Sequence, residues 1–156
     1  MTSIPSELIQ QPEFLGGVFQ EIENAFNELD FRETLSDFLP AITESQSNHF
    51  SQRKDSGGSI WPPLSKYTVA KKGHDIPLVE TTRLRESVTS QGHPDHIEAV
   101  SHRGLLFGTR VEYGIFHQEG AGRIPQRAFL GIESPLVDSV VSGVADHAVE
   151  SLKFRI

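Results

Sequence analysis

The chain has 156 residues and a formal net charge of −7 at pH 7, from 14 Lys and Arg against 21 Asp and Glu. Contacts to phosphates need clustered basic side chains, so this acidic chain is not expected to bind nucleic acid sequence-specifically. It has no cysteine, which excludes disulfides and thiolate metal sites. The length and the 37% of hydrophobic residues are typical of one globular domain with its own core.

Neither a membrane segment nor an export signal is visible in the sequence. No apolar run approaches the ~20 residues needed to span a bilayer. The first five residues lack the basic region and apolar stretch of a signal peptide. We therefore expect no membrane partner, and synthesis in the cytoplasm.

Two helices are predicted in the N-terminal third. They follow a flexible lead over residues 1–12 and begin a single domain over 13–156. The first helix starts near Glu13, where apolar residues recur at helical spacing and form one stripe. The stripe consists of Leu15, Val18, Phe19, Ile22, Phe26 and Leu29.

The second predicted helix covers residues 37–54. Ser36 is its expected N-cap, and Pro40 falls in the first turn, where no backbone N–H is needed. Gly57-Gly58 is expected to supply the left-handed backbone at its end. Its apolar stripe is narrow, because Ser45-Gln46 interrupts it.

Residues 55–80 are rich in glycine and proline and predict a long loop, which in a compact domain is usually functional. Its single tryptophan, Trp61, is expected to anchor the loop on the core, because the indole ring buries a large area. Short helical turns are predicted over 65–71 and, capped by Thr81-Thr82, over 83–86.

The next segment predicts a small antiparallel meander. Its strands are expected over 87–90, 97–101 and 105–111, where β-branched or alternating residues lie between turn residues. One helical turn is predicted over 113–118, ended by the glycines that follow it.

The C-terminal helix has the clearest signals. Ser134 is its expected N-cap, Pro135 suits its first position, and Gly143 falls outside its apolar stripe. That stripe consists of Val137, Val140, Val141, Val144, Ala148 and Leu152. The predicted fold class is α+β, with two N-terminal helices, a small antiparallel β-meander and a C-terminal helix packed on the sheet.

Local motifs for catalysis or cofactor binding are absent from the sequence. His93, His96 and His102 lie near one another, but their spacing does not make ligands converge on a metal. The HExxH, GxSxG and phosphate-loop patterns do not occur. We expect no catalytic residue, no metal site, no cofactor and no enzymatic activity. Two alternatives stay open: a small metal-dependent hydrolase that uses the histidines, and an adaptor protein of a mobile element.

Four segments follow one another in a distinctive order. Residues 57–66 read Gly-Gly-Ser-Ile-Trp-Pro-Pro-Leu-Ser-Lys, and residues 82–88 read Thr-Arg-Leu-Arg-Glu-Ser-Val. Residues 113–120 read Tyr-Gly-Ile-Phe-His-Gln-Glu-Gly, and residues 124–131 read Ile-Pro-Gln-Arg-Ala-Phe-Leu-Gly. This order resembles the phage virion morphogenesis family, the tail-completion proteins of contractile-tailed phages, over roughly residues 35–155.

Three of these segments are close to patterns of that family, written TGxLxxS, YAxIHQxG and IPxRPFLG. Two departures stand out: Arg83 replaces the usual glycine of the first pattern, and Ala128 replaces a common proline of the third. The turn before Leu84 is therefore expected to be built differently, and the segment after Arg127 to be less rigid.

The resemblance implies a non-enzymatic α+β subunit that self-associates into a ring, with sixfold symmetry expected, and contacts other phage tail or neck proteins. It implies assembly in the cytoplasm of a bacterial host and a final place in the virion tail or neck. On this basis, nine residues in two stretches are candidates for the assembly interface. They are Trp61, Pro62, Tyr113, His117, Gln118, Ile124, Pro125, Arg127 and Phe129.

Arg127 is the expected polar anchor of that interface. Its guanidinium can form a bidentate pair with a carboxylate, within the subunit or across a ring contact. We expect the Arg127→Ala variant to weaken ring formation and to leave the melting temperature of the monomer nearly unchanged.

Overall fold

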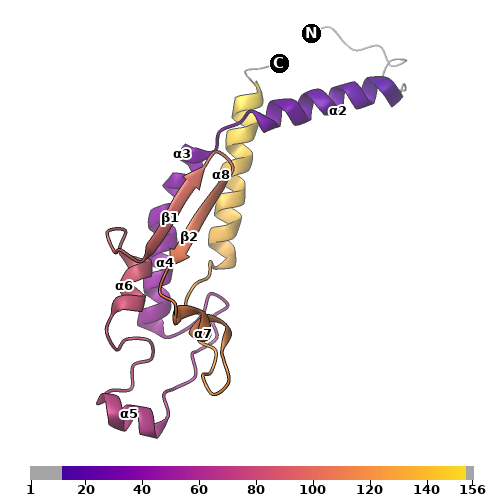
Figure 1. Ribbon diagram of the computed structural model, residues 1–156. Helices are drawn as coiled ribbons and strands as arrows, with labels where there is room; N and C mark the ends of the chain where they lie inside the picture. The colour runs from indigo at the N-terminus through magenta and orange to yellow at the C-terminus, as the bar shows by residue number, and fades with distance from the viewer. Residues whose placement is uncertain (1–11, 154–156) are drawn as a thin grey trace.

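A computed structural model describes residues 12–153, and these residues form an elongated α+β molecule (Figure 1). The predicted α+β class is confirmed. The predicted flexible lead lies outside the described residues except for Pro12, which begins the first helix. In chain order the elements are α2 (Pro12–Asn27), α3 (Arg32–Asp37), α4 (Leu39–Gln52), α5 (Lys66–Lys72), α6 (Arg83–Thr89), β1 (His96–Ser101), β2 (Gly104–Thr109), α7 (Gly114–Glu119) and α8 (Ser134–Lys153).

Helix α2 forms where the apolar spacing predicted it, but it projects sideways from the end of the body (Figure 1). Ile22 and Phe26 are 54% and 44% exposed, so this part of the stripe is only partly covered. The side chains of Leu15, Val18 and Phe19 lie outside the described residues. Leu29 lies beyond the helix, in the linker to α3, where it is buried.

The second predicted helix is split in two. Ser36 lies inside α3, and α4 begins after Phe38, so the prediction of Ser36 as the N-cap was wrong. Pro40 does lie in the first turn of α4. The helix ends at Arg53, which takes the left-handed conformation (φ 54°) four residues before the glycines expected to do so.

A first hydrophobic cluster, which we call the helix core, lies where α3, α8 and the hairpin meet. Helix α3 contacts α8 and both strands. The buried residues of the cluster are Leu29, Phe31, Leu35 and Ala148, and Val100, Leu105, Val140 and Val144 pack against them. Helix α8 therefore packs mainly on α3, and it reaches the sheet through this shared core.

The C-terminal helix differs from its prediction in two details. The carbonyl of Glu133 accepts the first hydrogen bonds of α8, so Ser134 is the first helical residue and not the N-cap. Gly143 does not lie on a free side, because a Cβ built there would come within 3.1 Å of the Phe38 ring. Glycine thus permits the close approach of α8 to α3. Val137 and Val141, counted in the apolar stripe, are exposed.

The sheet is a two-stranded hairpin and not a three-stranded meander. Strands β1 and β2 pair antiparallel from His96↔Thr109 to Ser101↔Gly104. Residues 87–89, predicted as a strand, complete α6 instead. Leu84, Ser87 and Val88 are all buried, and their i, i+3, i+4 spacing puts them on one helix face. Tertiary burial therefore outweighs the β propensity of Val88.

A second hydrophobic cluster, which we call the loop core, lies toward the α5–α7 end of the molecule. Its buried residues are Phe50, Trp61, Leu84, Val88, Val111 and Phe129. The rings of Phe50 and Trp61 meet edge to face with centroids 5.5 Å apart. Trp61 is 4% exposed, so the prediction that it anchors the long loop is confirmed.

The short helices on this side follow their predictions in part. Ser65 caps α5, and its side chain accepts a hydrogen bond from the Thr68 backbone N–H. Thr82 stands at the start of α6 in the left-handed region (φ 57°) but makes no side-chain capping bond. Helix α7 ends at Gly120, which also has positive φ, as the sequence predicted.

Candidate assembly interface

The sequence segments that carry the family resemblance meet at the loop core. The backbone N–H of Arg127 donates to the carbonyl of His117 (2.7 Å), which joins the 124–131 segment to α7. The indole N–H of Trp61 donates to the carbonyl of Ala128 (2.9 Å), which joins the 57–66 segment to the same 124–131 segment. Two irregular pieces of chain and the short helix α7 are thereby fixed against one another.

Gln118 binds the backbone of the 124–131 segment. Its Oε1 accepts from the N–H groups of Phe129 and Leu130, at 3.0 Å each, and its Nε2 donates to the carbonyl of Leu130 (2.8 Å). Phe129 is 1% exposed, so these bonds satisfy backbone groups at the edge of the core. Gln118 is therefore positioned to hold the segment in place.

Arg127 has different partners from those predicted. Its Nε donates to the carbonyl of Pro62 (2.7 Å) and its Nη2 to the carbonyl of Pro63 (3.0 Å). The side chain is buried, and no carboxylate within residues 12–153 pairs with it. Burial lowers the pKa of the guanidinium. The expectation of a carboxylate pair within the subunit was wrong, because the loop after Trp61 offers two free carbonyls instead.

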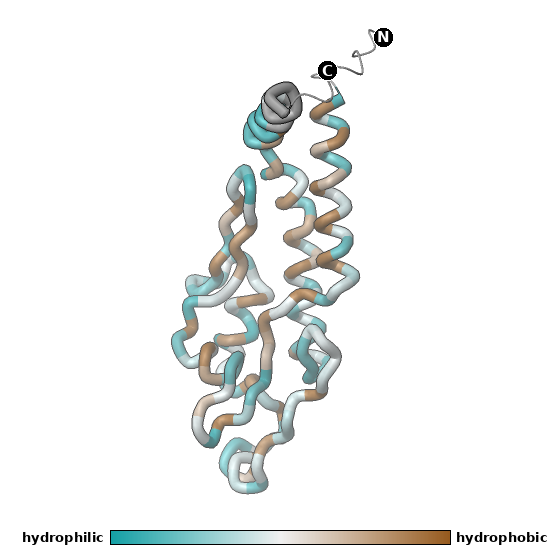
Figure 2. Tube along the Cα trace, turned by 90° about the vertical axis from the view of Figure 1, so that its right-hand side faces the viewer, coloured by the Kyte–Doolittle hydropathy of each residue, from teal (hydrophilic) through white to brown (hydrophobic). Residues whose placement is uncertain are grey.

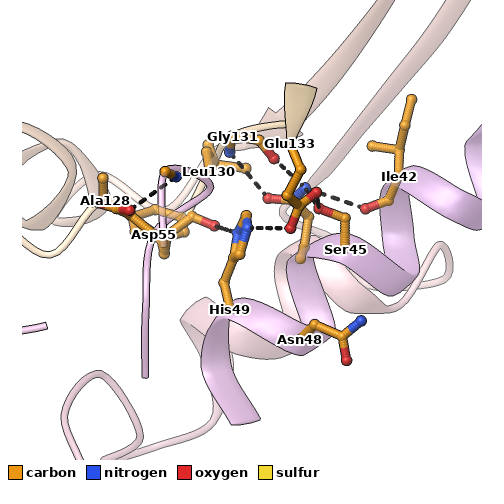
Figure 3. A network of polar contacts seen from close by, with 12 residues as sticks. Ile42, Ser45, Asn48, His49, Asp55, Ala128, Leu130, Gly131 and Glu133 are labelled. Atoms are coloured by element: carbon orange, nitrogen blue, oxygen red, sulfur yellow. Dashed lines mark hydrogen bonds and ion pairs between the residues drawn. The ribbon is translucent and has the colours of Figure 1, made fainter. Parts of the chain in front are cut away.

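A buried polar network on α4 fixes the other side of the same segment (Figure 3). Gln46 pairs with Gly131: its Nε2 donates to the Gly131 carbonyl (2.8 Å) and its Oε1 accepts from the Gly131 N–H (3.3 Å). His49 reaches the Phe129 carbonyl with Nδ1 (3.0 Å) and Glu133 with Nε2 (2.9 Å). Ser45 donates to the second oxygen of Glu133 (2.6 Å).

Sequence reasoning missed this network. Ser45 and Gln46 interrupt the apolar stripe in the sequence, yet they are 6% and 1% exposed, and His49 is fully buried. The available signal was that these polar residues occupy helix positions between Ile42 and Phe50, on the face that points to the core. Buried polar groups need hydrogen-bond partners, and here the partners are far away in sequence.

The protonation of the network follows from its geometry. A carbonyl oxygen only accepts, so the Nδ1 of His49 that faces Phe129 carries a proton. Burial by itself raises the pKa of the Glu133 carboxyl. The hydrogen bond from Ser45, a backbone hydrogen bond and the interactions with His49 outweigh that effect, so the net pKa lies below its ordinary value. Glu133 is therefore ionised at neutral pH.

A cavity of about 820 Å³ opens beside the loop core, between α5, α7 and the segment around Arg127. Tyr113, His117, Ile124, Pro125 and Arg127 line it, and the loop after Trp61 supplies another wall. The Nδ1 of His117 is buried and has no hydrogen-bond partner within the described chain. Burial, together with the charges of Arg127 and Lys72, lowers the pKa of His117, so its ring is neutral at pH 7.

The structure divides the nine interface candidates into three groups. Trp61, Arg127 and Phe129 are buried within the subunit. His117 and Gln118 are half-buried. The remaining four are exposed and open to a partner: Pro62, Tyr113, Ile124 and Pro125. Their role in a contact between subunits stays a prediction.

The histidines considered as metal ligands have separate partners. His96 contacts the Ser87 carbonyl (2.8 Å) and Glu98 (3.3 Å), while His93 lies 3.9 Å from Asp95. Residues 12–153 contain no group of three or more His, Asp and Glu that could hold a metal ion. Within the same residues, none of the helices has the length and apolar character needed to cross a membrane.

The geometry describes a small α+β molecule whose irregular end is held together by buried polar side chains. A sequence model of the phage virion morphogenesis family matches residues 17–149. Because this match covers most of the chain, the protein belongs to the phage virion morphogenesis family, and it is a phage virion assembly protein. Comparisons with curated proteins and with solved structures found no match.

Proposed function

We propose that this protein acts in tail completion or head–tail joining, as a ring of identical subunits that contacts other tail or neck proteins. The observation that carries this proposal is an apolar surface on α7 and the adjoining cavity wall. Tyr113, Ile115, Phe116 and Ile124 are 39–50% exposed there. Apolar surface gathered in one place on a soluble subunit marks an interaction site.

A ring needs two different surfaces on each subunit, since a head-to-tail contact repeats around a closed axis. The elongated body supports this arrangement, with a partly uncovered helix at one end and a cavity lined by both apolar and charged residues at the other (Figure 1). Sixfold symmetry is the expectation from the family resemblance. The ring would assemble in the bacterial cytoplasm and stay in the tail or neck of the virion.

The test is to disrupt the gene in the phage or prophage that carries it and to inspect the particles by electron microscopy. We expect capsids and tails to accumulate unjoined, and expression of the intact chain to restore joined particles. Joined, infectious particles without the protein would overturn the proposal.

Complementation with surface variants links this function to α7. The Ile115→Ser/Phe116→Ser variant is expected to fold and to fail in complementation. The matched control is Leu106→Ser, which changes an equally exposed apolar residue on the hairpin, 60% exposed, and is expected to complement.

A further inference from the structure

The helices at the two ends of the molecule, α2 and α5, carry opposite charges. Helix α2 contains three glutamates and no Lys or Arg, whereas α5 contains three lysines and no Asp or Glu. The two helices lie at opposite ends of the elongated body (Figure 1). They are therefore placed to meet between two copies of the chain.

Helix α2 also presents a partly uncovered apolar face, on which the Phe26 ring contacts that of Phe31 (centroids 5.8 Å apart). Ile22 and Phe26 stand one helical turn apart and are both exposed. Glu21 and Glu23, on either side of Ile22, are exposed as well. In Figure 2 the helix lies at the end of the molecule where α8 finishes, and it contacts α8 there. Its apolar and acidic side chains are thus accessible together.

The cavity beside α5 complements this helix in charge and in polarity. Lys72, Arg123 and Arg127 line it, and its carboxylate, Glu80, already pairs with Lys72 (2.9 Å). Apolar residues such as Leu78 and Ile124 form part of its walls, and Tyr67 on the adjoining α5 is 79% exposed. The buried Nδ1 of His117 still needs a hydrogen-bond partner.

We propose that α2 of one copy docks on α5 and the adjoining cavity of the next copy, in a repeating head-to-tail contact. Ile22 and Phe26 contact the apolar residues of the cavity, and Glu21 and Glu23 pair with the lysines of α5. This inference rests on the proposed ring, for which it names the two contacting surfaces. Opposite charges speed and orient such a contact, and the apolar side chains provide the burial.

The first experiment reverses the charges on each side. One variant carries Glu21→Lys and Glu23→Lys, and the other carries Lys66→Glu and Lys71→Glu. Each variant alone then opposes like charges, so its self-association should weaken by at least about tenfold, as measured by sedimentation of the full chain. An equal mixture of the two should associate as the wild type does, because each α2 now faces an α5 of opposite charge.

A control and a salt series complete this measurement. Asp37 and Glu44 are exposed acids on the body, so reversing them to lysine keeps the net charge change but leaves both docking surfaces intact. This control should associate as the wild type does. Raising the salt concentration should weaken the wild-type contact, because exposed charges are screened.

The second experiment uses the absence of cysteine in the chain. Chains with Glu23→Cys are mixed with chains that carry Lys71→Cys, and the mixture is oxidised. A disulfide-linked dimer of one chain of each kind is expected, and a mixture of Glu23→Cys with Glu44→Cys should not form it.

The experiments distinguish a failure of the proposed ring from a failure of this docking mode alone. If the wild type stays monomeric at concentrations up to about 1 mM, both the ring and this docking mode are wrong. If it self-associates but neither charge reversal changes the affinity and the mixed dimer does not form, only the docking mode is wrong, and the ring uses other surfaces.

Discussion

The helix core and the loop core differ in how their buried backbone groups are hydrogen-bonded. In the helix core, Leu35, Ala148 and Val100 belong to helices and a hairpin, whose backbone groups bond to each other. In the loop core, irregular segments bring backbone groups close to buried rings. Side chains such as Gln46, Gln118 and Arg127 bond to those groups instead. Where a core is built from loops, buried polar residues replace secondary structure as the source of hydrogen bonds.

The largest loss of stability is expected on replacing Arg127. The Arg127→Met variant keeps the apolar stem but removes two hydrogen bonds to the carbonyls of Pro62 and Pro63. We expect the free energy of unfolding to fall by about 2 to 3 kcal/mol in urea unfolding. This reverses the expectation from sequence that the monomer would be unaffected.

The control for this prediction is Arg123→Met. Arg123 lies four residues away, is exposed and should change the stability by less than about 0.5 kcal/mol. Equal effects of the two variants would show that the buried bonds of Arg127 do not hold the loop core together.

In the helix core, close packing rather than hydrogen bonding should set stability. The Gly143→Leu variant would push a side chain against Phe38, and overpacking should lower the unfolding free energy by about 2 kcal/mol. Thermal unfolding measures the effect. The double variant with Phe38→Ala should regain part of the loss. A neutral Gly143→Leu variant would mean that α8 and α3 separate easily.

The loop core should show a smaller steric effect at Gly131. A Cβ added there would lie 2.8 Å from the Cβ of Ser56, so Gly131→Ala should cost about 1 to 2 kcal/mol. Ser56→Gly in the same chain should restore most of it. For comparison, Gly17 on α2 has no atom within 4 Å of the added Cβ, and Gly17→Ala should be neutral or stabilising. Denaturant midpoints of the three variants test this order.

The smallest loss of stability is expected on replacing Glu133, and this loss depends on pH. Its pKa is lowered in the folded protein, so its contribution is present above the ordinary value of 4.5 and is lost as the pH falls through the lowered pKa. The Glu133→Gln variant should be less stable by roughly 1 kcal/mol at neutral pH. Its deficit should shrink on acidification, as followed by unfolding at several pH values. A deficit that stays constant with pH would mean that the charge of Glu133 is not involved.

Sequence patterns predicted well the features that depend on neighbouring residues. The spacing of apolar residues located α2 and α8, a short helical turn was predicted where α5 lies, and the glycines from Gly120 were predicted to end α7. Each of these depends on contacts within a few residues, and such contacts have the same preferences in any fold. The order of four segments was also enough to indicate the family that the comparison then confirmed.

The tertiary structure decided what those patterns could not. Val88 became helical because burial beside Leu84 and Ser87 outweighs its strand propensity. Gln46 binds Gly131 across 85 positions, His49 binds Glu133 across 84, and Arg127 binds Pro62 across 65. A polar residue in a stripe shows only that a partner is needed. Which partner satisfies it is determined when distant segments are packed together, because a buried donor and acceptor must meet within hydrogen-bonding distance.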